Sequence, residues 1–373
     1  MRIAHVSDCY LPRTGGIETQ VRALALQQAG AGHDVRIITA TAGDEGVFAG
    51  TEIRDGLTVH RVAARIPAGL PIHPRTYREV GAVLAADPVD VVHVHAGVIS
   101  PFAWGAIRAA RDAGVPVLVT VHCVWGAVAE RAFALSDRVL GWSDWGIQIS
   151  AVSGLAASRI ESAVPRCGPV LVIPNGISPA EWSIAAVPCA DSIVRLASVM
   201  RIAPRKRVIP LMRMLRAAQH MLGDSTRLEL TIIGDGPERA RAERFANRNN
   251  LAVHFAGRLD RAGILEQFAR TDIYVQPSIK ESFGLAALEA RCAGLPLVIH
   301  ADSGTTQFVT DGVEGLLGAD DWAMTGAIAR LAHDRSLRER IAEHNRSVDP
   351  ADSWPNVLQE VIHGYEVAAT ARG

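Results

Sequence analysis

The chain has 373 residues, of which 49% are hydrophobic and 21% are charged. A globular domain averages roughly 150 residues, so this length predicts two domains with additional helices, and the composition excludes a disordered chain. The 38 basic and 39 acidic side chains leave a formal net charge of −1, which argues against a nucleic-acid-binding protein.

The cysteines and the N-terminus bear on the cellular compartment. The five cysteines form no Cys-x-x-Cys pair and no cluster with histidines, which suits a reducing compartment and provides no zinc motif. Asp8 interrupts the first apolar stretch, so no secretory signal is recognisable, and no apolar stretch is long enough to span a bilayer. We expect a soluble cytoplasmic protein, which could also touch the inner face of a membrane peripherally.

Short apolar runs alternate with helical stretches, a pattern that predicts parallel sheets with helices on both faces. Ser153 precedes an alanine-rich run and is the expected N-cap of a helix. In chain order, the first half is predicted to contain a strand at 3–7, a helix at 17–31, strands at 35–39 and 57–62, a helix at 77–86, a strand at 89–95, a helix at 102–113, strands at 117–121 and 147–150 and a helix at 153–163. Residues 170–173 then run into a predicted turn at 174–176.

The periodicity fails between residues 177 and 192, so the domain linker is predicted there. The second half then contains, in order, a strand at 194–198, a helix at 207–222, a strand at 228–233, a helix at 237–249, a strand at 253–256, a helix at 261–269, a strand at 273–276, a helix at 285–293, a strand at 297–300 and closing helices at 321–332, 336–345 and 354–369. This order predicts an α/β protein with doubly wound domains at 1–176 and 193–348 and a final helical segment at 350–373. Ligands of such domains bind beyond the carboxyl ends of the strands, so we expect a site in a cleft between the domains.

Two glycine-containing turns follow predicted strands and open predicted helices. Gly15 and Gly16 precede the first helix, and Gly234 and Asp235 follow a strand of the second half. Glycine lets backbone amides approach an anion at a helix N-terminus, so both turns could bind phosphate. Glycine turns also open helices that bind nothing, and that alternative stays open for both.

Two cations follow the first strand of the second half. Arg201 and Lys206 lie on a predicted strand-to-helix loop, where a diphosphate at the strand ends would meet both. Two charge-assisted hydrogen bonds contribute about 3–6 kcal/mol, enough to decide binding. The alternative is a solvated surface loop, because Arg205 and Arg207 lie beside them.

Two carboxylates flank a glycine at the start of another predicted helix. Glu281 lies on the loop before this helix, and Glu289 lies about one turn into it. Between them, Phe283, Gly284 and Leu285 present backbone amides at the helix N-terminus. Carboxylates that accept from hydroxyls, beside amides that hold phosphate, suit a phosphorylated sugar. The alternative is that Glu281 only caps the helix.

Three histidines lie on predicted strands of the first half. His93 and His95 share one strand face because strand side chains alternate, and His122 ends a different strand. An isolated histidine at a strand end is more often a hydrogen-bonded structural residue, so contact with a substrate is the second interpretation.

Taken in order, these motifs resemble the family-4 retaining glycosyltransferases, which have the GT-B fold of two Rossmann-like doubly wound domains facing a central cleft. The resemblance covers essentially the whole chain, and the two glutamates around Phe-Gly-Leu are its most specific part. The matching segments are Gly-Gly-Ile near the start, Thr-Val-His122, Pro-Asn175-Gly-Ile, Arg201 with Lys206, Gly234-Asp-Gly-Pro, Gly-Arg258-Leu259, and Glu281-Ser-Phe-Gly-Leu with Glu289.

The resemblance implies roles for these residues. The cations would hold the donor diphosphate, Glu281 would bind hydroxyls of the transferred sugar, and Glu289 would hold the ribose. His122 would lie beside the reacting sugar. The catalytic candidates are His122, Arg201, Lys206 and Glu281, and the donor-binding candidates are Gly15, Gly16, Gly234, Asp235, Arg258, Leu259, Phe283, Gly284, Leu285 and Glu289. Met200 and Gln307 depart from the family pattern, which usually has glycine and often glutamate at these positions.

The resulting hypothesis is transfer of a hexosyl group, with retention, from GDP-mannose or a UDP-sugar to a hydroxyl acceptor. No Asp-x-Asp triplet occurs, so we expect no metal and no cofactor, with the two cations neutralising the diphosphate. A sugar-nucleotide 2-epimerase and a non-catalytic nucleotide-sugar sensor stay open as alternatives. Lipid-linked acceptors are common in the family. The arginines that could meet an anionic membrane, or form an ordinary solvated face, are Arg75, Arg78, Arg108 and Arg111.

Overall fold

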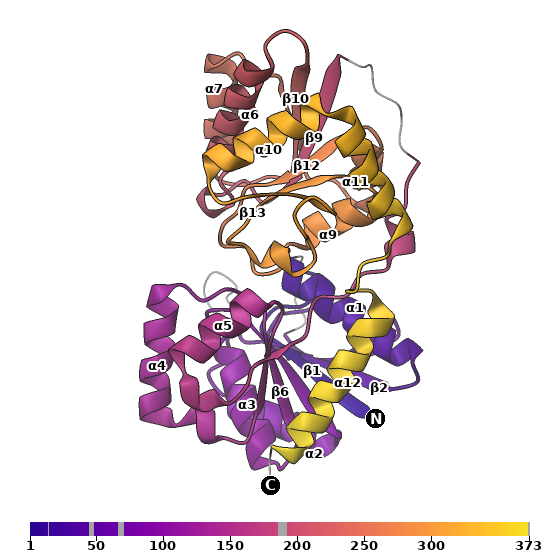
Figure 1. Ribbon diagram of the computed structural model, residues 1–373. Coiled ribbons are helices and arrows are strands. Elements are labelled where there is room, and N and C mark those ends of the chain that lie inside the picture. Colours follow the sequence, from indigo (N-terminus) through magenta and orange to yellow (C-terminus); the bar gives the residue numbers. More distant parts are fainter. Residues whose placement is uncertain (14, 45–47, 66–70, 186–191, 372–373) are drawn as a thin grey trace. The chain divides into compact units, whose positions relative to one another are not determined.

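The computed structural model describes residues 1–13, 15–44, 48–65, 71–185 and 192–371 (Figure 1). The chain divides into two compact units, one formed by Met1–Gly176 with Trp354–Gly373 and the other by Ile177–Ser353. Part of the predicted linker, residues 186–191, lies outside the described residues. The segment from Ile177 belongs to the second unit, where Ile177 forms a β-bridge with Ser353.

The first unit is built on an eight-stranded sheet in the order β3-β4-β2-β1-β5-β6-β7-β8. All neighbours pair in parallel except β3 and β4. The strands are β1 (Arg2–Ser7), β2 (Asp34–Thr39), β3 (Ala49–Arg54), β4 (Leu57–Val62), β5 (Val91–Ala96), β6 (Val117–Val121), β7 (Gln148–Ala151) and β8 (Leu171–Val172). The helices are α1 (Gly16–Gly30), α2 (Thr76–Ala86), α3 (Pro101–Asp112), α4 (Ala127–Leu140), α5 (Gly154–Ala163) and α12 (Trp354–Thr370).

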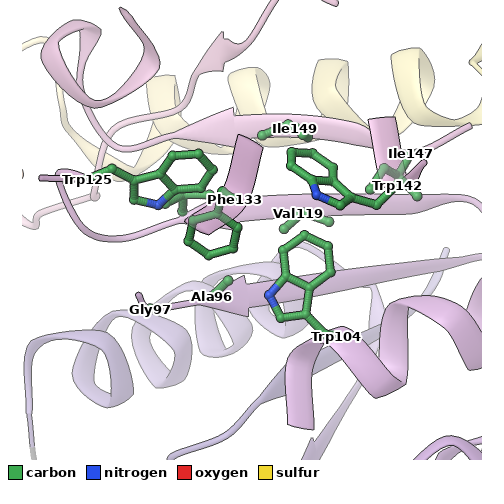
Figure 2. Close-up of a pocket in the computed structure, with 10 residues that line it drawn as sticks. Ala96, Gly97, Trp104, Val119, Trp125, Phe133, Trp142, Ile147 and Ile149 are labelled. Carbon is green, nitrogen blue, oxygen red and sulfur yellow. The ribbon is translucent and has the colours of Figure 1, made fainter. Parts of the chain in front are cut away.

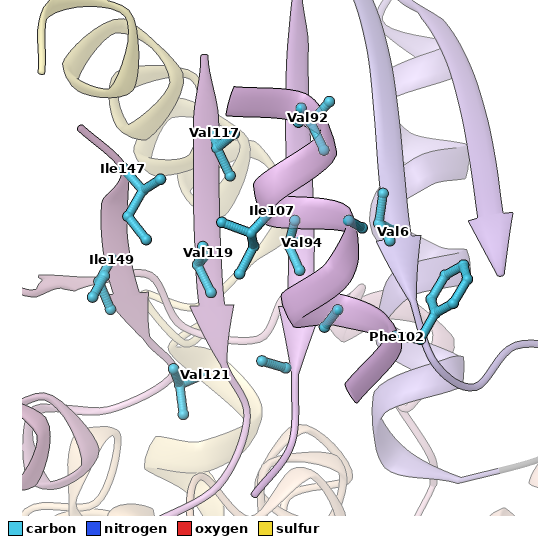
Figure 3. Close-up of a cluster of buried hydrophobic side chains, with 14 of the residues drawn as sticks. Val6, Val92, Val94, Phe102, Ile107, Val117, Val119, Val121, Ile147 and Ile149 are labelled. Carbon is cyan, nitrogen blue, oxygen red and sulfur yellow. The ribbon is translucent and has the colours of Figure 1, made fainter. Parts of the chain in front are cut away.

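The central strands of this sheet are buried on both faces, as expected for strands covered by helices. On one face, valines of β5 and β6 pack against Phe102 and Ile107 of α3 (Figure 3). On the opposite face, Leu118 and Ile3 pack against α12. That face also carries the histidines of β1 and β5, because side chains alternate along each strand. These histidines therefore form a row of polar side chains on the sheet face that α12 covers.

The start of α12 explains the Pro-Asn-Gly turn at residues 174–176. A Cβ atom on Gly176 would lie 2.2 Å from the ring of Trp354, so only glycine permits this packing. Gln20 of α1 donates to the Gly176 carbonyl at 3.2 Å. The turn thus joins α1, α12 and the end of the sheet.

The second unit is a six-stranded parallel sheet in the order β11-β10-β9-β12-β13-β14. Its strands are β9 (Ile193–Val199), β10 (Arg227–Ile233), β11 (Val253–Gly257), β12 (Ile273–Gln276), β13 (Leu297–His300) and β14 (Gly315–Gly318). Its helices are α6 (Val208–Leu222), α7 (Arg239–Arg248), α8 (Arg261–Ala269), α9 (Leu285–Cys292), α10 (Asp321–His333) and α11 (Arg335–Ser347). Leucines and methionines of α6 and α10 pack on β9 and β10 in its core.

The expected α/β class and parallel sheets are confirmed, and three elements were not expected. Strand β3 is mostly exposed and contains Gly50, so it lacks an apolar pattern. Strand β14 begins and ends with glycine, because a Cβ on Gly315 would lie 2.2 Å from the Leu297 carbonyl oxygen. Helix α4 has several exposed apolar side chains, which obscure its helical periodicity. The predicted N-cap is confirmed, since the Ser153 side chain accepts from the Ala156 amide at 3.3 Å.

Candidate active site

Lys206 and Glu281 meet at the carboxyl ends of the strands of the second unit. Lys206 ends a short 3-10 helix, η6 (Pro204–Lys206), and its Nζ lies 2.5 Å from Oε2 of Glu281. Gln276, the last residue of β12, donates to the same oxygen at 3.1 Å. The two side chains are largely shielded, with 18% and 13% of their surfaces exposed. Such a pair holds both charges in place, and it leaves Glu281 Oε1 without a partner among the described residues.

The other cations of this loop divide into two kinds. Arg201 is exposed, and its guanidinium has no hydrogen-bond or ion-pair partner in the described parts of the chain. Its neighbours are fixed, because the Met200 amide donates to Ile233 and the Ile202 amide donates to Asp235, each at 2.9 Å. Arg201 is therefore an uncommitted cation on a rigid backbone.

Arg207, in contrast, is structural. It adopts the left-handed conformation at φ 59°. Its guanidinium contacts both carboxylate oxygens of Asp321, at 2.7 and 2.9 Å, and the Pro277 carbonyl oxygen at 3.1 Å. This ion pair ties the loop to α10. The solvated-loop alternative therefore does not fit Arg207 or Lys206.

The Gly234 turn is required by close backbone packing. Gly234 has φ 128°, and a Cβ there would lie 2.0 Å from the Met200 carbonyl oxygen. Asp235 uses its carboxylate to accept from the Gly236 amide at 2.8 Å. Close packing alone therefore explains why glycine is required here, and no phosphate ligand is needed. This was the alternative interpretation of the turn in the sequence. The turn nevertheless supports the backbone that carries Arg201.

The Gly284 loop is held against a second loop. Gly284 has φ 92° and precedes the first residue of α9, Leu285. A Cβ on Gly284 would lie 2.5 Å from Thr305 Oγ1, and the Gly304 amide donates to the Glu281 carbonyl at 2.8 Å. The Phe283 side chain is buried, so this residue can offer a ligand only its backbone. The loop thus presents amides at the N-terminus of an eight-residue helix.

Glu289 is the second acid of the motif and is partly buried in α9. Burial raises the pKa of its carboxyl group to about 8, and the charge of Arg261 opposes that rise. No described residue forms a hydrogen bond with this carboxyl group. Glu289 is therefore available to a hydroxyl group of a ligand, either as donor or as acceptor.

Arg258 and Leu259 follow the last residue of β11, Gly257. The Gly234 amide donates to the Gly257 carbonyl at 2.6 Å, so the two turns adjoin. Arg258 is exposed and Leu259 is half-buried. Both therefore lie at the carboxyl end of the second sheet, where ligands of such sheets bind.

In the first unit, Gly15 and Gly16 open α1. Gly15 is the N-cap residue, with extended backbone and no capping side chain. A Cβ on Gly15 would lie 2.5 Å from Oε2 of Glu18, a flexible side chain. Both glycines are exposed. The helix N-terminus is thus open, with an acidic side chain beside it.

His122 ends a chain of buried hydrogen bonds. Its Nε2 lies 3.0 Å from His95 Nδ1, and His95 Nε2 lies 2.9 Å from His5 Nδ1. His5 Nε2 lies 2.7 Å from Gln28 Oε1, and Gln28 Nε2 donates to the Tyr365 hydroxyl at 2.9 Å. Burial lowers the pKa of His5 and of His122 to about 4 and that of His95 well below its ordinary value. These rings are neutral at physiological pH.

A side branch starts at Tyr365. Its hydroxyl lies 2.9 Å from His93 Nδ1, and His93 Nε2 lies 2.7 Å from Thr120 Oγ1. His5, His93 and His95 are close enough to suggest a metal site. Both nitrogens of each of these rings, however, already take part in the hydrogen bonds described above. A metal would have to break several of these bonds.

Sequence reasoning missed His5, Gln28 and Tyr365. His5 and His95 are neighbours only through the pairing of β1 with β5, and the two residues are 90 positions apart. Gln28 and Tyr365 meet because α1 and α12 cover the same sheet face. The one signal in the sequence was the alternation that places His93 and His95 on one face.

A second buried group in this unit is aromatic. Trp125 stacks on Phe133 with ring centroids 4.0 Å apart, and Trp104 packs edge-on against Trp142 at 5.3 Å (Figure 2). The cavity that these rings line measures about 10 Å³. One water molecule needs about that volume, so this is packed core and holds no sugar.

Comparison with known proteins identifies the class. The sequence pattern described as "Glycosyltransferase Family 4" matches residues 14–181, and the pattern "Glycosyl transferases group 1" matches residues 194–348. The chain therefore belongs to the family-4 retaining glycosyltransferases of the GT-B fold, enzymes that transfer a glycosyl group from a nucleotide sugar. The expectation drawn from the motifs is confirmed.

Individual relatives cover the full chain. A GDP-mannose-dependent alpha-mannosyltransferase of Mycolicibacterium smegmatis is 29% identical over 100% of this chain and 99% of its own. A phosphatidyl-myo-inositol mannosyltransferase of Mycobacterium leprae is 26% identical over 100% of this chain and 98% of its own. A glycosyltransferase structure from Rickettsia africae has a TM-score of 0.76 at 15% identity, with 98% of each chain covered. None of these three is an epimerase or a sensor.

Proposed function

We propose that this enzyme transfers a mannosyl group from GDP-mannose, with retention, to a hydroxyl group of a lipid-linked acceptor. The proposal rests first on the pair of Lys206 and Glu281 at the strand ends of the second unit. The names of two relatives support the sugar, the base and the lipid: one is GDP-mannose-dependent, and the other is a phosphatidyl-myo-inositol mannosyltransferase.

Lys206 is suited to hold the donor diphosphate. An ammonium group has three N–H bonds, and the contact with Glu281 is the one that described residues make with it. The other two N–H bonds can donate to phosphate oxygens. Arg201 adds a second, uncommitted cation five residues earlier. As the glycosidic bond breaks, charge develops on the leaving diphosphate, and preorganised cations stabilise it most at that moment.

Glu281 is suited to bind the transferred sugar. Lys206 and Gln276 both bind its Oε2, which orients the carboxylate and leaves Oε1 for a sugar hydroxyl group. Glu289 in turn is suited to the ribose hydroxyls. The Gly284 amide region would meet a phosphate oxygen. We propose that two cations and these amides replace a metal, so that transfer needs no divalent ion.

A membrane surface suits the outer face of α4. Val128, Leu135 and Val139 are 84%, 62% and 74% exposed, and they recur at the spacing of one helix face. Arg131 and Arg138 are exposed beside them. We call these five residues the α4 outer stripe. It combines apolar side chains with two positive charges and contains no acid, as in helices that lie on anionic membranes.

The acids of α4 face inward. Glu130 forms an ion pair with Arg159 at 3.5 Å, and Asp137 accepts from the Ser143 amide at 2.8 Å. Phe133 anchors the helix in the aromatic core (Figure 2). Because the charges of the α4 outer stripe are positive, we propose that this surface contacts an anionic bilayer. A second copy of α4 fits less well, because a symmetric contact would bring like charges together.

Two of the four arginines singled out in the sequence lie over aromatic rings of the first unit. Arg108 lies over the ring of Tyr77 at 5.6 Å, and Arg111 lies over that of Trp145 at 5.1 Å. No helix of the described chain has the length and apolar character needed to cross a bilayer.

Product analysis tests the proposed reaction. The enzyme is incubated with GDP-mannose, UDP-glucose or UDP-N-acetylglucosamine and with extracted phospholipid acceptors, and products are identified by mass spectrometry and anomeric NMR. We expect an α-mannosylated lipid from GDP-mannose. Transfer from a UDP-sugar alone would contradict the donor, and an inverted β-linkage would contradict retention.

Co-sedimentation with vesicles tests the membrane contact. We expect binding to vesicles that contain phosphatidylglycerol and weaker binding to pure phosphatidylcholine. Val128→Asp combined with Leu135→Asp should abolish binding. Ile53→Asp is the matched control, because Ile53 is 69% exposed on β3 of the same unit. Equal binding of all three proteins would refute the role of the α4 outer stripe.

A further inference from the structure

The hydrogen-bond chain beneath α12 is directional, and its direction reaches His122. Gln28 donates to the Tyr365 hydroxyl through Nε2, so its Oε1 faces His5. An amide oxygen only accepts, so His5 Nε2 must carry a hydrogen. Since the buried His5 ring is neutral, its Nδ1 has none and accepts. The orientation of one amide thus determines the tautomer of the first histidine.

The tautomer of His5 determines that of His95 and then that of His122. His95 Nε2 must donate to His5 Nδ1, which leaves His95 Nδ1 as an acceptor. His122 Nε2 must then donate to His95 Nδ1. Because His122 is also neutral, its Nδ1 carries a lone pair and no hydrogen. Each step follows from the one before, with no free choice after Gln28.

The side branch agrees with this direction. Tyr365 accepts from Gln28 and therefore donates to His93 Nδ1, so His93 Nε2 donates to Thr120. Thr120 then donates to the Ser150 hydroxyl at 2.7 Å, and Ser150 donates to the Val119 carbonyl at 3.4 Å. In the reversed direction Ser150 would donate to Thr120, and this carbonyl would lose that contact. The direction deduced here thus satisfies one more acceptor.

No described residue hydrogen-bonds to the lone pair of His122. His122 is half-buried, and its Nδ1 has no partner among the described residues. His122 follows the last residue of β6, at the carboxyl edge where ligands of such sheets bind.

We propose that Gln28, His5 and His95 are positioning residues that hold His122 in the Nε2–H tautomer, so that its Nδ1 accepts a hydrogen bond from a hydroxyl group of a sugar at the carboxyl edge of the first sheet. The contact with sugar rests on the proposed function, whereas the tautomer does not. A ring fixed in this way favours a hydroxyl donor and disfavours a phosphate oxygen, which offers no hydrogen.

NMR of protein labelled with ¹⁵N-histidine tests the tautomer without any substrate. Resonances of His122 are assigned by their loss in His122→Gln. We expect a protonated Nε2 and an unprotonated Nδ1 in the wild type. Gln28→Met removes the acceptor and should give a mixture of tautomers.

Thr120→Val is the matched control, because Thr120 is buried on the side branch and off the chain to His122. It should leave the His122 tautomer unchanged. Thermal unfolding of each variant checks that it is folded. A protonated Nδ1 in the wild type, or a tautomer indifferent to Gln28→Met, would overturn the proposal.

Kinetics test the sugar contact separately. Gln28→Met should lower kcat/KM several-fold, up to about tenfold, as expected for one weakened hydrogen bond. His122→Phe should lower kcat/KM at least as much. An expected tautomer with unchanged kcat/KM in His122→Phe would overturn the sugar contact. A wild type that transfers no sugar from any donor would instead contradict the proposed function, while the NMR result would stand.

Discussion

Replacing Gly234 by alanine tests how the fold positions Arg201. The new Cβ would lie 2.0 Å from the Met200 carbonyl oxygen, and the residue has φ 128°. An L-residue in such a conformation costs about 1–3 kcal/mol. Relief of the overlap would also break the backbone hydrogen bonds from Met200 to Ile233 and from Ile202 to Asp235, at about 0.5–1.5 kcal/mol each. The total is about 2–6 kcal/mol.

Differential scanning calorimetry measures this loss. For a unit of this size, 1 kcal/mol shifts Tm by about 2–4 °C, so we expect a fall of about 4–24 °C in the transition of the second unit. Gly326→Ala is the matched control, because a Cβ there in α10 meets nothing within 4 Å. It should be neutral or stabilise by about 0.5–1 kcal/mol. A Gly234→Ala protein that melts at the wild-type temperature would refute the packing argument.

Three further outcomes follow. Burial raises the pKa of Glu289 to about 8, so the folded protein keeps a proton that the unfolded chain releases. The free energy of unfolding should therefore fall as pH rises from about 5 to 8, and Glu289→Gln should weaken this dependence in urea titrations at both pH values. EDTA should leave transferase activity unchanged, and a loss restored by magnesium would contradict the metal-free mechanism. Arg207→Ala should lower the free energy of unfolding by about 1.5–3 kcal/mol, because it removes the ion pair with Asp321 and the hydrogen bond to the Pro277 carbonyl oxygen; equal urea midpoints would contradict this.

Most of the fold could be predicted because buried parallel strands are short apolar runs. The exceptions have local causes. Strand β3 is an exposed edge without an apolar face, and β14 needs glycine where its backbone approaches Leu297. Helix α4 carries apolar side chains on both its inner and outer faces. A pattern based on one apolar face cannot find such elements.

The candidate site was predictable where it depends on strand ends. Lys206 and Glu281 follow neighbouring parallel strands, β9 and β12, so their proximity follows from the order of the sheet. The chain from Gln28 to His122 could not be predicted, because it depends on which face of α1 meets α12. That contact is set by packing of Trp354 and Tyr365, far along the chain.

Isothermal titration calorimetry with GDP tests the central claim most directly. If Lys206 holds the diphosphate, Lys206→Ala should weaken Kd about tenfold to a hundredfold, the equivalent of one charge-assisted hydrogen bond of about 1.5–3 kcal/mol. Arg205→Ala should bind like the wild type, because Arg205 is exposed in the same loop and, unlike Lys206, makes no contact with Glu281. Equal affinities of the Lys206→Ala and Arg205→Ala proteins for GDP would contradict the account.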